Sequence, residues 1–197
     1  RNLVKHGSLL MHNKIISELD FNIIPDEKTI VIESIRTDRN VVIHACFGTK
    51  INSTLATVLS SLLESVLGHI VESRSDAYRI VLESNARINK KIIVETLSDN
   101  FVLNDIVSTS LIRTHNLNWR TWCVAKKFGI VGRGAIYDRK TGHFMHEKYQ
   151  NTSVVREALR ELFHDKFDLI GTEIVLNRIR NNEIHIEWID ANKFSKL

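Results

Sequence analysis

The sequence is poor in the residues that mark several common classes of protein. One proline and two cysteines occur among its 197 residues. The two cysteines, Cys46 and Cys123, are too few for a disulfide-stabilised secreted fold and are typical of a reducing compartment, so we expect a cytoplasmic protein. No uninterrupted apolar run approaches the ~18 residues that span a bilayer, so we expect no membrane partner.

Motifs for nucleotide binding and nucleophilic catalysis are missing as well. Gly48 stands alone before Lys50, whereas a Walker A loop has the pattern G-x-x-x-x-G-K-[ST]. His44 and Cys46 lie two positions apart on a predicted strand, about 6.5 Å along it, which is too far for the ~3 Å hydrogen bond between a nucleophile and its base. No set of His, Cys and carboxylate residues has metal-site spacing. We therefore expect no catalytic residue, metal or cofactor in this chain.

What is present in the first half is a strand-rich pattern around one long helix. Apolar residues from Ile51 to Leu67 recur with the period of a helical face, and Gly68 stands where a C-cap is expected. Short runs rich in β-branched residues surround this helix. Strands are predicted at residues 29–35, 41–47, 70–71, 78–83 and 91–97.

The second half is predicted to be helical. Helices are expected at residues 99–113, 117–128, 153–164 and 168–180, followed by a strand at 184–189. The fold class is therefore α+β, with a mixed or antiparallel sheet or a barrel-like module and packed helices, followed by a mostly helical subdomain closed by a short strand. We place a β-rich module at residues 23–114 and the helical subdomain at 115–197.

The net charge of +4 is mildly basic, and it is concentrated in residues 119–140, WRTWCVAKKFGIVGRGAIYDRK. This segment holds six basic residues and a single acid, a net charge of +5. On a helix, Trp119 lies on the side of Arg120, Lys126 and Lys127. An indole among cations suits single-stranded nucleic acid, because the ring stacks on a base while Lys and Arg neutralise phosphates. Alternatively, Trp119 packs on a neighbouring domain and the lysines are solvated.

Two further segments offer weaker candidates. Residues 129–140 form a glycine-rich loop with Arg133, Tyr137, Arg139 and Lys140, which suits a wedge or a strand guide but equally a merely mobile loop. Lys50, at the start of the long helix, is a secondary candidate for binding a phosphate; a plain strand-to-helix turn has equal weight.

Six segments resemble one family. They are IPDE from Ile24, VVIHACFGTKIN followed by TLATVLSSLL, DAYRIVLE, WR-x-x-x-VAKKFG, YQNT-x-V-x-REALREL and EIHIE, and they cover nearly all of residues 24–189. In these segments the chain resembles the C-terminal part of the core of archaeal large helicase-related (Lhr) proteins, which are superfamily 2 helicases.

The resemblance implies a place in a larger machine. The family has two RecA-like ATPase domains, a winged-helix domain and then a β-barrel-and-helix module, which together clamp the tracking strand during 3′-to-5′ movement. The chain begins at Arg1 without a leader, so we expect an internal or C-terminal piece, with residues 1–22 as the end of the winged-helix domain or a linker. ATP and Mg²⁺ would bind the upstream domains, and this piece alone would not hydrolyse ATP.

The function expected from residues and resemblance together is a nucleic-acid-binding module that holds single-stranded DNA or RNA and couples it to the RecA-like and winged-helix domains of the same chain. The alternative is a structural brace on the ATPase domains without nucleic-acid contact. The resemblance also implies an aromatic contact to the tracking strand, for which Trp119 and Tyr137 are both candidates. The predicted contact residues are Trp119, Arg120, Lys126, Lys127, Arg133, Tyr137, Arg139, Lys140 and, secondarily, Lys50.

Overall fold

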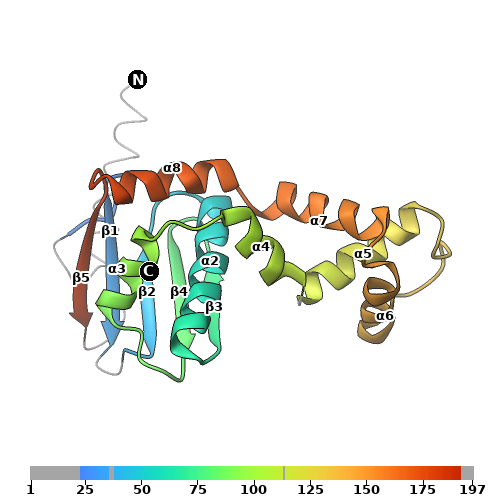
Figure 1. Cartoon of the computed structure of the whole chain (residues 1–197), viewed down its shortest axis with the longest axis horizontal. Coiled ribbons are helices and arrows are strands. Elements are labelled where there is room, and N and C mark those ends of the chain that lie inside the picture. Colours follow the sequence, from blue (N-terminus) through green and yellow to red (C-terminus); the bar gives the residue numbers. More distant parts are fainter. Residues whose placement is uncertain (1–22, 36–37, 113, 192–197) are drawn as a thin grey trace, which may run out of the picture.

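The computed structural model describes residues 23–35, 38–112 and 114–191, and Figure 1 shows their arrangement. The predicted end of a winged-helix domain in residues 1–22 lies outside the described residues. The described chain forms a sheet covered by helices, from which a further group of helices extends sideways.

Five strands form one open, mixed sheet in the order β3-β4-β2-β1-β5. β5 pairs with β1 in parallel, whereas the other neighbours are antiparallel. The edge strands β3 and β5 do not pair with each other, so of the two predicted arrangements the sheet is confirmed and the barrel is wrong. The strands are β1 (Thr29–Ile35), β2 (Asn40–His44), β3 (Val71–Ser75), β4 (Arg79–Ser84) and β5 (His185–Ala191).

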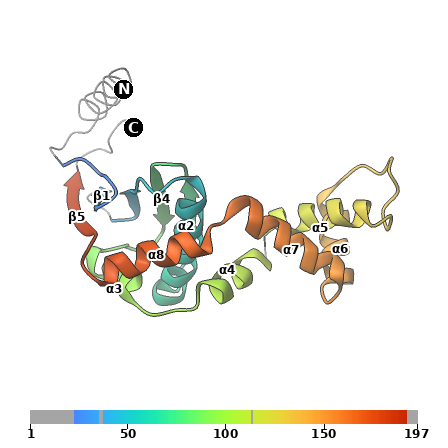
Figure 2. The same ribbon diagram turned by 90° about the horizontal axis from the view of Figure 1, so that it is seen from above.

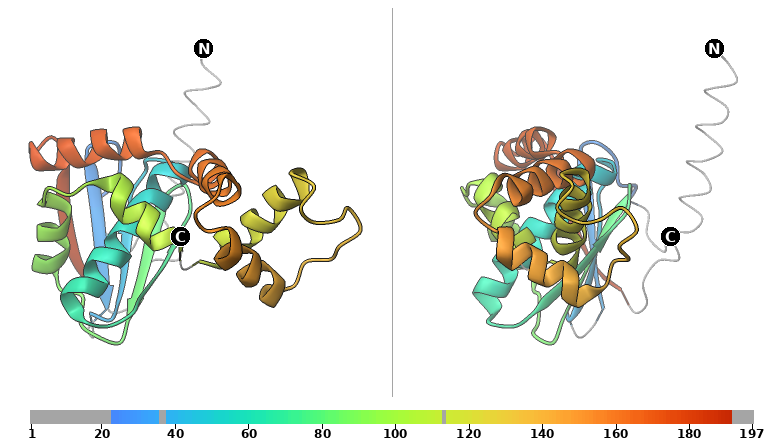
Figure 3. Two further views of the ribbon diagram at one scale, coloured as in Figure 1. Left: turned by 45° about the vertical axis from the view of Figure 1, so that its right-hand side comes forward. Right: turned by 90° about the vertical axis from the view of Figure 1, so that its right-hand side faces the viewer.

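Four helices pack on the sheet through one hydrophobic cluster, and the right-hand view of Figure 3 shows the helices on one side of the strands. Ile32, Ile43 and Ile80 lie on that face in adjacent strands and are buried against Leu59 and Leu176 of the helices. The view from above in Figure 2 shows α8 running from α3 across α2. The four are α2 (Thr49–Leu67), α3 (Lys90–Ser98), α4 (Leu103–Ile112) and α8 (Leu169–Arg180).

The longest helix of the described residues, α2, follows its sequence pattern closely. Leu55, Leu59 and Leu63 recur every four residues and are buried, which is the spacing of one helical face. Gly68 has φ 65° and its N–H donates to Glu64, so the predicted C-cap is confirmed. Glycine tolerates this left-handed conformation because it lacks a Cβ.

The segment predicted as a strand at residues 91–97 is instead helix α3. The side chain of Asn89 accepts a hydrogen bond from the N–H of Ile92 at 3.0 Å and so caps the helix. Ile93 and Leu97, one helical turn apart, are buried in the core. A cap and a helical spacing of the buried residues thus outweigh the β-branched composition, which is a weak preference.

The three other helices of the described residues form a second unit, which we call the helical arm. They are α5 (His115–Lys127), α6 (Arg139–Tyr149) and α7 (Ser153–Lys166). Leu117 and Val124 of α5 pack with Ala158 and Leu162 of α7 in a hydrophobic cluster separate from that of the sheet. Figures 1 and 3 show the arm projecting beyond the edge of the sheet.

The arm is an excursion between two parts of the sheet unit. The chain leaves the sheet unit after α4 and returns to it through α8 and then β5, and β5 pairs with β1. The boundary near residue 115 stays a prediction; in the structure, residues on both sides of it contribute to one sheet.

Candidate nucleic-acid interface

Three aromatic rings meet on the arm, in what we call the aromatic cluster. Trp119 and Trp122 of α5 stack with their centroids 5.5 Å apart and their planes 20° apart. Tyr137, which precedes α6, stands edge-on to both, with centroids 4.7 Å from Trp119 and 5.5 Å from Trp122. Stacked and edge-to-face pairs at these distances are favourable beyond the area that they bury. The two aromatic candidates therefore lie together.

The cluster is anchored on one side and open on the other. Trp122 is only 5% exposed, whereas Trp119 is 46% exposed. Lys126 lies beside them, with its Nζ 4.6 Å from the centroid of Trp122 while donating to the carbonyl of Ala135 at 3.0 Å. Sequence reasoning missed Trp122; its position three residues after Trp119 on a helix was the available signal. Trp119 thus presents an exposed indole that is held by the buried Trp122 and the half-buried Tyr137.

A glycine of α6 makes room for the tyrosine. A Cβ at Gly142 would lie 2.5 Å from Cε2 and 2.7 Å from Oη of Tyr137, closer than van der Waals contact allows. α6 itself was not predicted, and its start is fixed by Asp138, whose side chain accepts from the N–H of Thr141 at 2.9 Å. The predicted loop at residues 129–140 is therefore shorter, and it ends in a helix that holds Tyr137 against the tryptophans.

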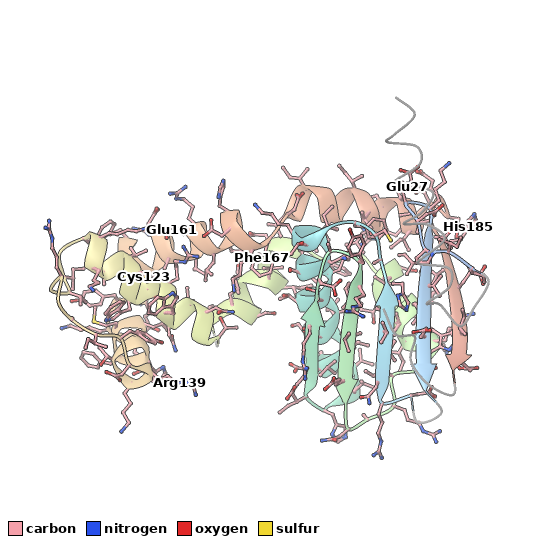
Figure 4. All side chains as sticks on the ribbon, turned by 180° about the vertical axis from the view of Figure 1, so that it is seen from behind. Glu27, Cys123, Arg139, Glu161, Phe167 and His185 are labelled. Atoms are coloured by element: carbon pink, nitrogen blue, oxygen red, sulfur yellow. The ribbon has the colours of Figure 1, made fainter. Side chains whose placement is uncertain are left out.

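Two of the predicted cations are occupied by an ion-pair network between α5 and α7. Arg120 contacts Glu161 at 3.1 Å and Asp165 at 2.8 Å, and Lys127 contacts Glu161 at 2.7 Å. Figure 4 labels Glu161 on α7, with Cys123 on α5 and Arg139 on α6, the three helices of the arm. Arg120 and Lys127 therefore fasten the arm together.

The hydrogen bonds and charges around this network lower the pKa values of two acids, Glu161 and Asp165. The hydrogen bond from Lys127 holds the pKa of Glu161 below its usual range, against a smaller rise from burial, and the hydrogen bond from Arg120 adds to the lowering. The pKa of Asp165 is lowered by its hydrogen bond with His164 and by the charge of Arg120. Both carboxylates thus stay charged in the folded chain at pH values where they would be protonated when unfolded.

We predict that Glu161→Gln lowers the free energy of unfolding by about 1–3 kcal/mol at neutral pH, because it removes a charged acceptor from two cations. A carboxylate with a lowered folded pKa contributes stability that is complete above its unfolded value of about 4.3 and is lost as pH falls through the folded value. The variant should therefore lose less stability than the unmodified chain between neutral and acidic pH. Urea denaturation across this range measures both effects.

The matched control is Glu157→Gln on the same helix. Among the described residues Glu157 forms an ion pair with Arg160, at 2.6 Å, and the arginine is largely exposed, so solvent screens the pair and the expected loss is much smaller than for Glu161. Equal effects of the two substitutions would contradict the special role of Glu161.

The other three cations of the segment are exposed. Arg133 lies in the loop between α5 and α6, and Arg139 and Lys140 open α6. Their side chains make no hydrogen bond or ion pair with another described residue. Asp138 directly precedes Arg139 and Lys140, but its carboxylate accepts hydrogen bonds from Thr141, and these hydrogen bonds lower its pKa. Within residues 119–140, these three are the exposed cations without an ion pair to another described residue.

Lys50 lies away from the arm's exposed end. Its Nζ donates to the carbonyl of His164 at 2.8 Å, near the end of α7. Close by, the N–H of Asp168 donates to the hydroxyl of Thr54 at 3.1 Å. Both bonds tie α2 to the point where the arm rejoins the sheet, so Lys50 is part of that junction and is not grouped with the other candidates.

His44 is the last residue of β2, whereas Cys46, predicted on the same strand, lies two residues beyond its end, and the two side chains contact different groups. His44 is buried and its Nε2 lies 3.0 Å from Oε2 of Glu33 on the neighbouring strand. Cys46 is exposed as a residue, and its Sγ lies 3.6 Å from the carbonyl of Pro25. The sulfur itself is partly buried, which raises the pKa of the thiol, and the charge of Asp26 adds to the rise. The described residues contain no group of three or more potential metal ligands and no helix long and apolar enough to cross a membrane.

Comparison with known protein families gives one match that covers most of the chain. A family model described as DEAD/H associated matches residues 24–197. Among curated proteins, the chain is similar to two proteins named ATP-dependent helicase Lhr-Core. The protein from Sulfolobus acidocaldarius is 22% identical over 209 residues, covering 98% of this chain and 24% of that protein. The protein from Saccharolobus solfataricus is 24% identical over 202 residues, covering 93% and 23%.

A solved structure has the same fold. The Mycobacterium smegmatis helicase Lhr, in a structure bound to ssDNA and AMP-PNP, superposes with a TM-score of 0.74 at 16% sequence identity, over 92% of this chain and 25% of that one. At this identity the likeness concerns the fold alone. The chain spans about a quarter of the length of these relatives.

Proposed function

Because the chain belongs to the DEAD/H associated family, we propose that it is the accessory module of an Lhr-type helicase that grips single-stranded nucleic acid. The resemblance to Lhr-type superfamily 2 helicases is confirmed by the family match and by the relatives. Grip on a strand is supported most directly by Trp119, an exposed indole held by two other rings. The structurally similar mycobacterial helicase was solved with ssDNA bound, which supports the same proposal.

In this proposal the exposed ring of Trp119 stacks on a base. Such stacking contributes about 1–3 kcal/mol per base and tolerates any sequence. Trp122 and Tyr137 already fix the ring, so little side-chain freedom is lost on binding. Arg133, Arg139 and Lys140 then neutralise phosphates on either side. The result is a grip that is independent of sequence, as a helicase that moves along a strand requires.

The parent protein supplies the rest of the activity in this proposal. Upstream RecA-like domains would bind ATP and Mg²⁺, and a winged-helix domain would precede the described sheet. Movement along DNA or RNA would pull the strand across the arm, while the sheet unit transmits the load to the ATPase domains. No residue of the present chain is assigned a catalytic role.

We predict that neutralising Arg133, Arg139 and Lys140 together weakens binding to single-stranded DNA and makes it less sensitive to salt. Each phosphate contact on a single strand contributes about 0.7 to the slope of log K against log salt, so the loss of three contacts should reduce the slope by about 2. Fluorescence anisotropy with a labelled oligonucleotide over a range of salt concentrations measures the slope. Lys126 and Lys127 are expected to contribute less, because both are engaged within the arm.

A triple variant elsewhere gives the matched control. Arg87, Lys90 and Lys91 are exposed at the start of α3 on the sheet unit, and their replacement by alanine removes the same charge. If this control reduces the slope as much as the arm variant, binding follows net charge and the arm is not the specific contact.

The rival function is a brace on the ATPase domains. One observation favours it: Ile170 and Ile174 on α8 are 78% and 57% exposed and lie one turn apart, as in a surface covered by another domain. They lie on the sheet unit, so bracing through α8 and strand contact through the arm can coexist. A chain that shows no binding to single-stranded DNA or RNA at low salt would leave the brace as the whole function.

A further inference from the structure

The outer side of α6 presents an aromatic ring between two lysines. Lys140, Phe144 and Lys148 are spaced by four residues and so lie one above the other on one side of the helix. All three are exposed, Phe144 by 58%, and Nζ of Lys148 lies 5.8 Å from the centroid of the Phe144 ring. We call this set the Phe144 row. Neither Phe144 nor Lys148 was among the residues suggested by the sequence.

The row is not needed to attach α6 to the arm. The helix packs through its opposite side, where Gly142, Met145 and His146 are buried. Phe144 belongs to neither hydrophobic cluster of the described residues. A large apolar ring that is exposed between cations and contributes to no core is the arrangement that single-stranded nucleic acid favours, since every base has a face that can stack.

We infer that the Phe144 row is a second contact for the nucleic-acid strand, continuing the path that begins at the aromatic cluster. The inference rests on the proposed function. α6 starts two residues after Tyr137, so the two contacts adjoin along the chain. At 1.5 Å per residue, the two lysines are about 12 Å apart along the helix. They are thus placed to neutralise phosphates on both sides of a base stacked on Phe144, which extends the grip beyond a single base.

One acid lies on the same side of α6 and sharpens the test. Glu147 is exposed next to the row and pairs with His143 at 3.4 Å. Its charge would repel a phosphate backbone that runs along the helix. Removing this charge should therefore strengthen binding, a gain that damage to the fold would not produce.

The test compares Phe144→Ala, Lys148→Ala and Glu147→Gln in the 197-residue chain, with Trp119→Ala as the reference. Anisotropy titrations use labelled oligodeoxythymidine of about 4 and about 16 nucleotides, the range of site sizes for single modules. We expect Phe144→Ala to weaken binding of the longer strand about 5- to 100-fold and to spare the shorter one. Lys148→Ala should reduce its salt slope by about 0.7. Glu147→Gln should strengthen binding of the longer strand.

The outcomes separate the inference from the proposed function. Trp119→Ala should weaken binding of both oligonucleotides. If Phe144→Ala then leaves binding of the longer oligonucleotide unchanged, the Phe144 row does not contact the strand. The same result is expected if the row binds a protein partner instead. If Glu147→Gln fails to tighten binding of the longer strand, the inference is likewise overturned. If Trp119→Ala has no effect on either strand, the proposed function itself fails. Circular dichroism of each variant establishes that the helices are intact, as expected for exposed positions.

Discussion

Replacing Trp119 by alanine is expected to weaken binding of the chain to single-stranded DNA about 5- to 150-fold. The physical reason is the loss of one stacked base, which costs about 1–3 kcal/mol, where 1.4 kcal/mol is a factor of ten. The salt slope should not change, because the indole contacts no phosphate. Trp119→Phe should recover part of the affinity, since a smaller ring still stacks. Anisotropy titrations at several salt concentrations give the affinity and the slope together.

The control for this variant is Ile170→Ala on α8. Both substitutions remove an exposed apolar side chain, but only Trp119 lies on the arm. Trp119→Ala also loses its contacts with two rings, so a stability loss of about 0.5–1.5 kcal/mol per ring pair is expected alongside the loss of binding. A stability loss of this size with unchanged affinity would favour the brace and contradict the base contact.

Where the sequence predicted structure well, the pattern was long and its ends were marked. α2 has a buried leucine on every turn and ends at a glycine with positive φ, so both its period and its end could be derived. β1 was placed at its observed bounds because its apolar residues and flanking polar residues leave one interpretation. Such elements need no knowledge of their neighbours.

The wrong secondary-structure predictions concern short segments, in which a single capping side chain decides whether a helix forms. Residues 91–97 contain three β-branched residues in succession, yet the cap from Asn89 and the buried pair Ile93 and Leu97 make them helical. α6 follows glycines that suggested a loop, and only the cap at Asp138 marks its start. In both cases the polar N-cap residue just before the helix indicated the helix start, whereas the composition of the segment suggested a strand or a loop.

For the candidate site, the sequence identified the region but not which of its cations are exposed and which form ion pairs within the arm. Residues 119–140 do hold the aromatic cluster and three exposed cations. Arg120 and Lys127, however, face acids that are 34 or more residues away in the chain. A helical wheel shows on which face of a helix a cation lies. It does not show which acidic side chains of another helix pack against that face. The ion pairs with Glu161 were therefore beyond prediction from one helix.

Gly142→Ala is expected to release Tyr137 from the aromatic cluster. In an ordinary helix interior this substitution stabilises by about 1 kcal/mol, because alanine is the better helix former. Here the new Cβ would lie 2.5 Å from the tyrosine ring, and overpacking of this kind costs about 1–3 kcal/mol. We therefore expect a net loss of stability of up to about 2 kcal/mol, opposite in sign to the propensity effect. Urea denaturation measures the sign.

The more specific readouts are tryptophan fluorescence and strand binding. Displacing Tyr137 removes the edge contact with both indoles, so the emission of the unbound chain should change, and Trp119, less firmly held, should bind the strand several-fold more weakly. The double variant with Tyr137→Ala should show no further loss, because the glycine then has nothing to accommodate.

Gly134→Ala, in open space with no atom within 4 Å of its added Cβ, is the matched control and should change neither readout. Additive effects of Gly142→Ala and Tyr137→Ala would mean that the glycine serves some other contact. Coupled effects would mean that the absence of a side chain at Gly142 sets the geometry of the exposed Trp119 ring. The reason is that α6 can pack close enough to the tryptophans to hold Tyr137 against them only when residue 142 has no Cβ.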